Sequence, residues 1–147
     1  MAESSTSLNQ GVLNMIKGIG VDIVEIERFK KALANHQNLS AKLFTPGEQE
    51  YCRQKARPHR HYALRFAAKE AVLKALGIGF RGVKWTDIEI SHDDLGKPLV
   101  NLNGKTAQKA SDLEVGEVLI SLSFNQANAV ASAIAVGPTG SKDEVKA

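Results

Sequence analysis

Residues 65–77 have the sequence RFAAKEAVLKALG, in which strong helix formers are followed by a glycine. This composition predicts an α-helix of about three turns, and Gly77 suits the left-handed residue that often follows a helix C-terminus. Four charged residues interrupt the apolar stretch as two pairs spaced four apart, each on one helix face: Arg65 with Lys69, and Glu70 with Lys74. The simplest interpretation is two solvent-facing strips, with a weak ion pair between Glu70 and Lys74.

A second carboxylate lies far upstream, in a predicted strand that begins near Ile16. Asp22 lies in the middle of this strand, on the face opposite three apolar residues: Ile19, Val21 and Ile23. Gly18 and Gly20 share the face of Asp22 and leave room there for another backbone or a ligand. If buried, Asp22 needs a cation, a metal or several hydrogen-bond donors. The alternatives are a solvent-facing aspartate at a strand end, or a cap of the next helix.

Length and composition limit the class of protein. The chain has 147 residues, 43% of them hydrophobic and 24% charged, which is typical of one globular domain. No apolar run approaches the ~20 residues that span a membrane, and residues 1–10 lack the apolar core of a signal peptide, so we expect a cytoplasmic protein. Cys52 is the single cysteine and excludes an internal disulfide. The net charge of +3 is too diffuse to indicate nucleic acid, but it favours anionic ligands or acidic partners.

The expected fold is α+β, a single domain over residues 15–136 with an antiparallel sheet packed on the long central helix. Residues 1–14 and 137–147 are predicted to be a flexible leader and tail. Helices are expected at 26–34, at 105–113, and after Thr45, where Pro46 and Glu48 complete a capping-box pattern. Strands are expected at 83–90 and from Pro98, and the clearest hairpin joins strands at 117–124 and 129–136.

Two clusters of positive charge stand out. The helix at 26–34 carries Arg28, Lys30 and Lys31 on its polar face, which is either a solvated surface or a docking site for an acidic partner. The second cluster precedes Arg65, and its two histidines are predicted to be loop residues: Arg53, Lys55, Arg57, His59, Arg60 and His61. It suits a phosphate-rich small molecule or an acidic protein, and its histidines lack the spacing of a metal site.

Three motifs occur in an order that matches a known family. They are GIGVDI at 18–23, RFAAKEAVLKALG at 65–77 and SLS at 121–123, with WTDIEI at 85–90 and GKP at 96–98 between the last two. The chain closely resembles the short-chain 4′-phosphopantetheinyl transferases, the holo-(acyl-carrier-protein) synthases, over roughly residues 16–136. The resemblance implies transfer of 4′-phosphopantetheine from coenzyme A to a serine of an apo acyl carrier protein, in fatty acid biosynthesis, with release of adenosine 3′,5′-bisphosphate.

The resemblance also implies roles for individual residues. Asp22 and Glu70 match the family's magnesium ligands, and this pair suits an ion that takes one or two carboxylates plus phosphates. Lys74 would stabilise the leaving group, so that Asp22, Glu70 and Lys74 form the catalytic set. The implied coenzyme A contacts are Arg65, Lys74, Gly96, Lys97, Pro98 and Ser123. The implied docking residues for the carrier protein are Arg28, Lys30 and Lys31. The family's trimers further imply a homotrimer with active sites at subunit interfaces, where a neighbouring protomer contributes residues 96–98.

The sequence departs from the family pattern in two places. Phe124 stands where the family commonly has a histidine near the coenzyme A phosphates, and a phenyl ring donates no hydrogen bond. Asn35, His36 and Asn38 make the docking helix less basic than in many relatives. Two alternatives remain: a module that binds coenzyme A without turnover, or an interaction domain in which Glu70 and Lys74 form a structural pair. The general base is also open, since Glu70 could act directly or through a water.

Overall fold

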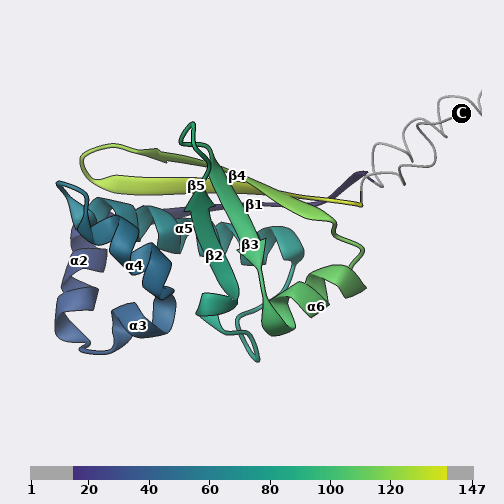
Figure 1. The fold of residues 1–147 in the computed structure, drawn as a ribbon, viewed down its shortest axis with the longest axis horizontal. Helices are drawn as coiled ribbons and strands as arrows, with labels where there is room; N and C mark the ends of the chain where they lie inside the picture. The colour runs from purple at the N-terminus through teal and green to yellow at the C-terminus, as the bar shows by residue number, and fades with distance from the viewer. Residues whose placement is uncertain (1–14, 139–147) are drawn as a thin grey trace, which may run out of the picture.

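The computed structural model describes residues 15–138, and its longest element is helix α5, Pro58–Leu76 (Figure 1). α5 ends as predicted, because Gly77 follows it with a φ of 68°. Its start differs from the prediction: the helix begins at Pro58 and not at Arg65, because a missing N–H is harmless in the first turn. His59 and His61, predicted to be loop residues, therefore lie in this helix and are half-buried.

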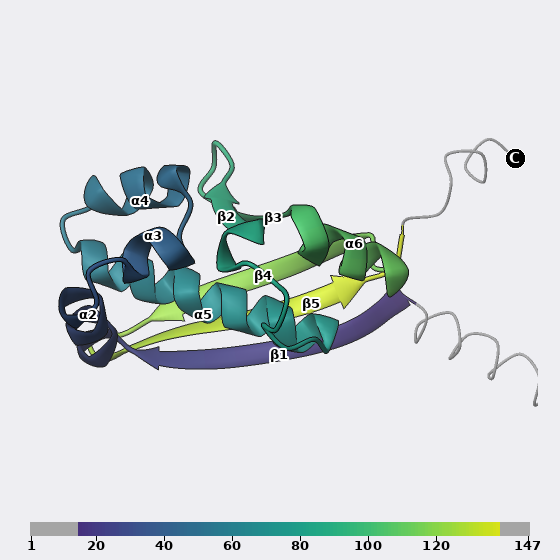
Figure 2. The ribbon, with the colours of Figure 1, turned by 90° about the horizontal axis from the view of Figure 1, so that it is seen from below.

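A three-stranded antiparallel sheet packs against α5. It contains β1 (Ile16–Glu25), β4 (Glu117–Phe124) and β5 (Asn128–Val136) in the order β1-β5-β4. The alanines of the central strand β5 that face the helix are all buried: Ala129, Ala131, Ala133 and Ala135. Figure 2 shows α5 running along this sheet. The predicted hairpin and the predicted packing of a sheet on a long helix are both confirmed.

Two glycines bring β1 close to α5. A Cβ atom on Gly18 or Gly20 would overlap the backbone carbonyl oxygens of Ala75 and Ala71, respectively. Only glycine therefore permits this approach of the strand to the helix. The contact confirms that the glycine face of β1 accommodates another backbone, and it directs Asp22, on the same face, toward α5.

Three short helices cover the N-terminal end of α5: α2 (Ile26–Asn35), α3 (Leu39–Leu43) and α4 (Pro46–Arg53). They enclose a second cluster of buried side chains around Phe29, Phe44 and Cys52. The capping box predicted for α4 is present: the Thr45 side chain accepts from the Glu48 N–H, and the Glu48 carboxylate accepts from the Thr45 N–H.

The segment between α5 and β4 differs in part from the prediction. Instead of one strand over 83–90, the chain forms a 3₁₀ turn, η1 (Trp85–Asp87), and then β2 (Ile88–His92). The turn forms because Asp87 donates its N–H to the carbonyl of Lys84. β2 pairs with β3 (Pro98–Leu102), which begins at Pro98 as predicted, and α6 (Gly104–Asp112) follows.

The predicted leader, residues 1–14, lies outside the described residues, as does the predicted tail from 139 onward. Gly137 is described, and it donates its N–H to the carbonyl of Met15 at 2.7 Å. Among residues 15–138, no helix is long and apolar enough to cross a membrane.

The sheet face that points away from α5 carries an exposed apolar row. Ile19, Ile134 and Leu119 are aligned across the three strands by the strand register, and Ile19 is 72% exposed. Val21 and Ile23 extend the row along β1 and are also exposed. An exposed patch of this kind is characteristic of a surface that contacts another protein.

Candidate functional site

Asp22 and Lys74 form the ion pair of this site. Lys74 Nζ donates to Asp22 Oδ1 at 3.1 Å and to the carbonyl of Val21 at 3.0 Å. The simplest interpretation of the sequence, an ion pair between Glu70 and Lys74, is therefore not what forms: Lys74 extends to β1 instead of along its own helix. The close approach of β1 to α5 explains this choice, because it places the Asp22 carboxylate within reach of the Lys74 side chain.

Glu70 lies half-buried one turn before Lys74. Burial raises the pKa of the Glu70 carboxyl, the negative charge of Asp22 raises it further, and Lys74 partly offsets both effects. Asp22 and Glu70 line one cleft of about 610 Å³, together with Arg28 and Asn128. The structure thus brings together two carboxylates that the sequence places 48 residues apart.

The donors in this cleft fit a divalent ion that shares its ligands with phosphate. Within residues 15–138 there is no group of three or more histidine, cysteine or acidic side chains able to hold a metal. A site made by the protein alone is therefore not present in this part of the chain. Two carboxylates, with the remaining positions taken by phosphate oxygens and water, match the usual coordination of Mg²⁺.

Arg65 is buried, at 1% exposure, so the simplest interpretation of a solvent-facing strip with Lys69 is wrong. Its guanidinium lies 4.0 Å from the ring centre of Tyr51, and its Nη2 is 3.3 Å from His92 Nδ1. Its Nε has no hydrogen-bond partner. None of the ion pairs found among residues 15–138 includes Arg65. This is a buried cation with no anion beside it, an arrangement that favours binding of an anionic ligand.

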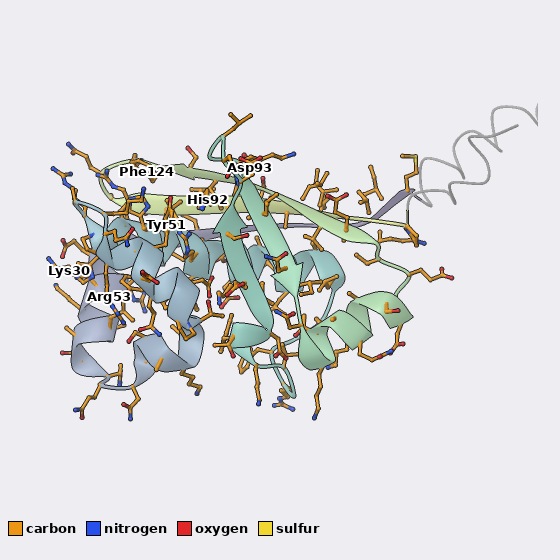
Figure 3. All side chains as sticks on the ribbon, viewed as in Figure 1. Lys30, Tyr51, Arg53, His92, Asp93 and Phe124 are labelled. Atoms are coloured by element: carbon orange, nitrogen blue, oxygen red, sulfur yellow. The ribbon has the colours of Figure 1, made fainter. Side chains whose placement is uncertain are left out.

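A second cleft, of about 470 Å³, lies beside Arg65. It is lined by residues from four parts of the chain: Tyr51, His61, Leu64, His92, Gly96, Lys97, Pro98, Ile120, Ser121, Leu122 and Phe124. Figure 3 shows Tyr51, His92 and Phe124 gathered where α4, β2 and the end of β4 meet. Residues 96–98 thus face this cleft of their own chain, whereas Ser123 is exposed on the same strand as Phe124 and does not line it.

Tyr51, His61 and His92 were not among the predicted site residues. Tyr51 stacks on His92 with ring centres 4.8 Å apart. The ring of His61 is steeply inclined to the ring of Tyr51, at 76°, with ring centres 6.0 Å apart. Arg60 lies 4.3 Å from the ring centre of Phe124. The one signal in the sequence is the basic cluster before Arg65, whose charge suits a phosphate-rich ligand.

The three predicted docking residues are exposed on α2. Arg28 also lines the cleft of Asp22 and Glu70, so the basic face of α2 borders the candidate metal site. Lys30 projects from α2 into solvent (Figure 3).

Comparisons with known proteins agree on one family. The family model of the 4′-phosphopantetheinyl transferase superfamily matches residues 18–133. A holo-(acyl-carrier-protein) synthase from Geobacter sulfurreducens is 49% identical over 126 residues, covering 84% of this chain and 100% of that protein. The holo-(acyl-carrier-protein) synthase structure from Neisseria meningitidis has a TM-score of 0.77 at 35% identity, covering 82% of this chain and 98% of that one. A holo-(acyl-carrier-protein) synthase structure from Bacillus anthracis, in complex with CoA (3′,5′-ADP), has a TM-score of 0.69 at 33% identity. The match covers 84% of this chain and 98% of that one.

Proposed function

Since this chain belongs to the 4′-phosphopantetheinyl transferase superfamily, we propose that it is a magnesium-dependent holo-(acyl-carrier-protein) synthase. It transfers 4′-phosphopantetheine from coenzyme A to a serine of apo acyl carrier protein and releases adenosine 3′,5′-bisphosphate. The observation that carries the proposal is the meeting of Asp22 and Glu70 in one cleft, next to Lys74. The buried thiol of Cys52 suits a protein that acts in the reducing cytoplasm.

The residues of this cleft have separable roles in the transfer. Asp22 and Glu70 would hold Mg²⁺, which offsets the charge on the pyrophosphate of coenzyme A. The serine oxygen forms a bond to the phosphorus next to the pantetheine arm, and the bond from that phosphorus to the bridging oxygen breaks. Lys74, whose side chain is about half exposed beside Asp22, stabilises the negative charge that the leaving nucleotide gains. The raised pKa of Glu70 favours it as a proton acceptor, directly or through a water.

The basic face of α2 would orient the carrier protein. Arg28, Lys30 and Lys31 are exposed there and attract an acidic surface. Because Arg28 also lines the cleft of Asp22 and Glu70, a partner docked on α2 presents its serine close to the reacting phosphate. The second cleft, which is lined by residues 96–98 and lies next to the buried Arg65, would hold the nucleotide end of coenzyme A.

A homotrimer with sites at its subunit interfaces is also part of this proposal. The exposed row of Ile19, Ile134 and Leu119 supports it, because a second copy of the sheet face would cover apolar side chains that are otherwise in contact with water. We expect light scattering to give three times the mass of the chain in solution. A monomer at micromolar concentration would contradict the trimer and leave the proposed chemistry untouched.

The direct test is the intact mass of an apo acyl carrier protein after incubation with this protein, coenzyme A and Mg²⁺. We expect the carrier to gain one phosphopantetheine group, and we expect a chelator to prevent the gain. Binding of coenzyme A without any gain, across several carriers, would favour the binding module. An absence of magnesium-dependent coenzyme A binding would favour the interaction domain.

A further inference from the structure

The surroundings of His92 define the charge in the second cleft. The titratable and charged groups that surround this ring or line its cleft come from α4, α5, the segment between them and the turn after β2: Tyr51, Lys55, His61, Arg65, Asp93 and Lys97. Asp93 is the only carboxylate in this set. It is exposed, and its Oδ1 already accepts the N–H groups of Leu95 and Lys97. The cleft therefore carries an excess of positive charge.

The His92 ring is held in place on two sides. It lies nearly parallel to Tyr51, at an angle of 8°, and its Nδ1 lies 3.3 Å from Arg65 Nη2. Arg65 can only donate, so Nδ1 is the acceptor and a neutral ring carries its proton on Nε2. Burial lowers the pKa of His92, and the positive charges of Arg65 and Lys55 lower it further, while Asp93 opposes them. The neutral ring is thus the stable form beside these cations.

We propose that His92 is a positioning residue for the 3′-phosphate of coenzyme A: it orients Arg65, donates its Nε2–H to the phosphate, and takes up a proton when the phosphate binds. This inference rests on the proposed function. Arg65 precedes Glu70 by five residues on α5, so it lies about 7.5 Å away along the helix axis and about 140° around it. The cleft beside Arg65 is therefore separate from the cleft of Asp22 and Glu70. If the pyrophosphate lies at Glu70 and Lys74 of one copy, the positively charged second cleft suits the separate phosphate on the ribose.

Proton uptake follows from the charge of the ligand. A phosphate monoester carries close to two negative charges near neutral pH. Next to His92 it would reverse the effect of Arg65 and Lys55, because an anion stabilises the protonated imidazole that the cations disfavour. The protonated ring also turns Nδ1 into a donor, which releases Arg65 to bind the phosphate with its guanidinium.

Titration calorimetry with coenzyme A and 3′-dephospho-coenzyme A tests this proposal. Each ligand is titrated near neutral pH in two buffers of different ionisation enthalpy, so that proton uptake is measured together with affinity. For the wild-type protein we expect tighter binding of coenzyme A, with proton uptake, and weaker binding of 3′-dephospho-coenzyme A without it. His92→Phe keeps a ring to stack on Tyr51 but removes both nitrogens. We expect it to bind coenzyme A roughly tenfold to a hundredfold more weakly and to lose the uptake, with little change for 3′-dephospho-coenzyme A.

Two further variants separate the roles of the ring. His92→Gln restores an N–H donor that cannot titrate, so part of the affinity should return without proton uptake. His36→Gln removes a histidine that is exposed after α2, and it should match the wild type. Unchanged proton uptake and unchanged preference for coenzyme A in His92→Phe would overturn the role of His92 alone. Failure of the wild-type protein to bind coenzyme A would overturn the proposed function as well.

Discussion

Replacing Asp22 by asparagine, or Glu70 by glutamine, is expected to lower the rate of phosphopantetheine transfer by at least about a hundredfold. Each substitution removes one of the two carboxylates that line the cleft, and a neutral amide is a poor ligand for Mg²⁺. The measurement is the initial rate of carrier modification by mass spectrometry over a range of Mg²⁺ concentrations. The loss should be largest when Mg²⁺ is limiting.

The same two variants should keep their fold. Asp22 and Lys74 form a partly exposed pair, for which we expect a loss of about 1 kcal/mol or less in the free energy of unfolding. Glu70→Gln removes a carboxylate that is disfavoured by burial and by the charge of Asp22, so its stability should be unchanged or higher. Glu27→Gln, at an exposed carboxylate in the first turn of α2, is the matched control. Near-normal transfer by Asp22→Asn or Glu70→Gln at limiting Mg²⁺ would contradict the assignment of the metal ligands.

The features that the sequence predicted well are determined by local chemistry. Gly77 ends α5 because its backbone adopts a left-handed conformation, and Thr45 with Glu48 begins α4 through the capping box. The glycines of β1 predicted a close approach of another backbone, and they determine where Asp22 lies. The two carboxylates could be paired only through the resemblance to a family, because nothing local connects residues 22 and 70.

The features that the sequence did not predict depend on packing between distant segments. Arg65 and Lys69 share a helix face that looked solvent-exposed, yet α4 and β2 cover it. Spacing along α5 favoured a pair between Glu70 and Lys74, but β1 lies close to α5, and Lys74 pairs with Asp22 of that strand instead. His92 lies beside Arg65 at the end of β2, where this strand pairs with β3. The amino-acid composition does not predict this position.

Lys69→Met is expected to lower the free energy of unfolding by about 3–5 kcal/mol, because it leaves the carboxylate of Glu48 buried without its cation. Both side chains of the pair are fully buried, and Lys69 Nζ lies 2.7 Å from Glu48 Oε1. The ammonium also donates to the carbonyls of Leu43 and Trp85, so it joins α5 to the end of α3 and to η1. Burial lowers the pKa of Lys69, and the charge of Glu48 opposes this effect.

Glu48 connects further segments from the other side of the pair. Its carboxylate accepts the N–H groups of Thr45, at the start of α4, and of Ile90, in β2. A glutamine at position 48 keeps an acceptor but removes the charge, so Glu48→Gln should be less destabilising than Lys69→Met. In the double variant neither charge remains to be buried alone. The double variant should therefore be more stable than the sum of the two single changes predicts.

Urea unfolding of the four proteins in this cycle gives the coupling free energy, which we expect to exceed about 1 kcal/mol. The control is Lys17→Met, which removes a 3.7 Å pair with the exposed Glu114 and should change stability by no more than about 1 kcal/mol. If the losses in unfolding free energy of the two single variants simply add in the double variant, the buried pair does not couple α3, α4 and β2 to α5. Glu70 follows Lys69 directly on α5, so the activity of the variant also has to be measured. If folded Lys69→Met still transfers phosphopantetheine with normal Mg²⁺ dependence, Lys69 stabilises the fold and takes no part in the reaction.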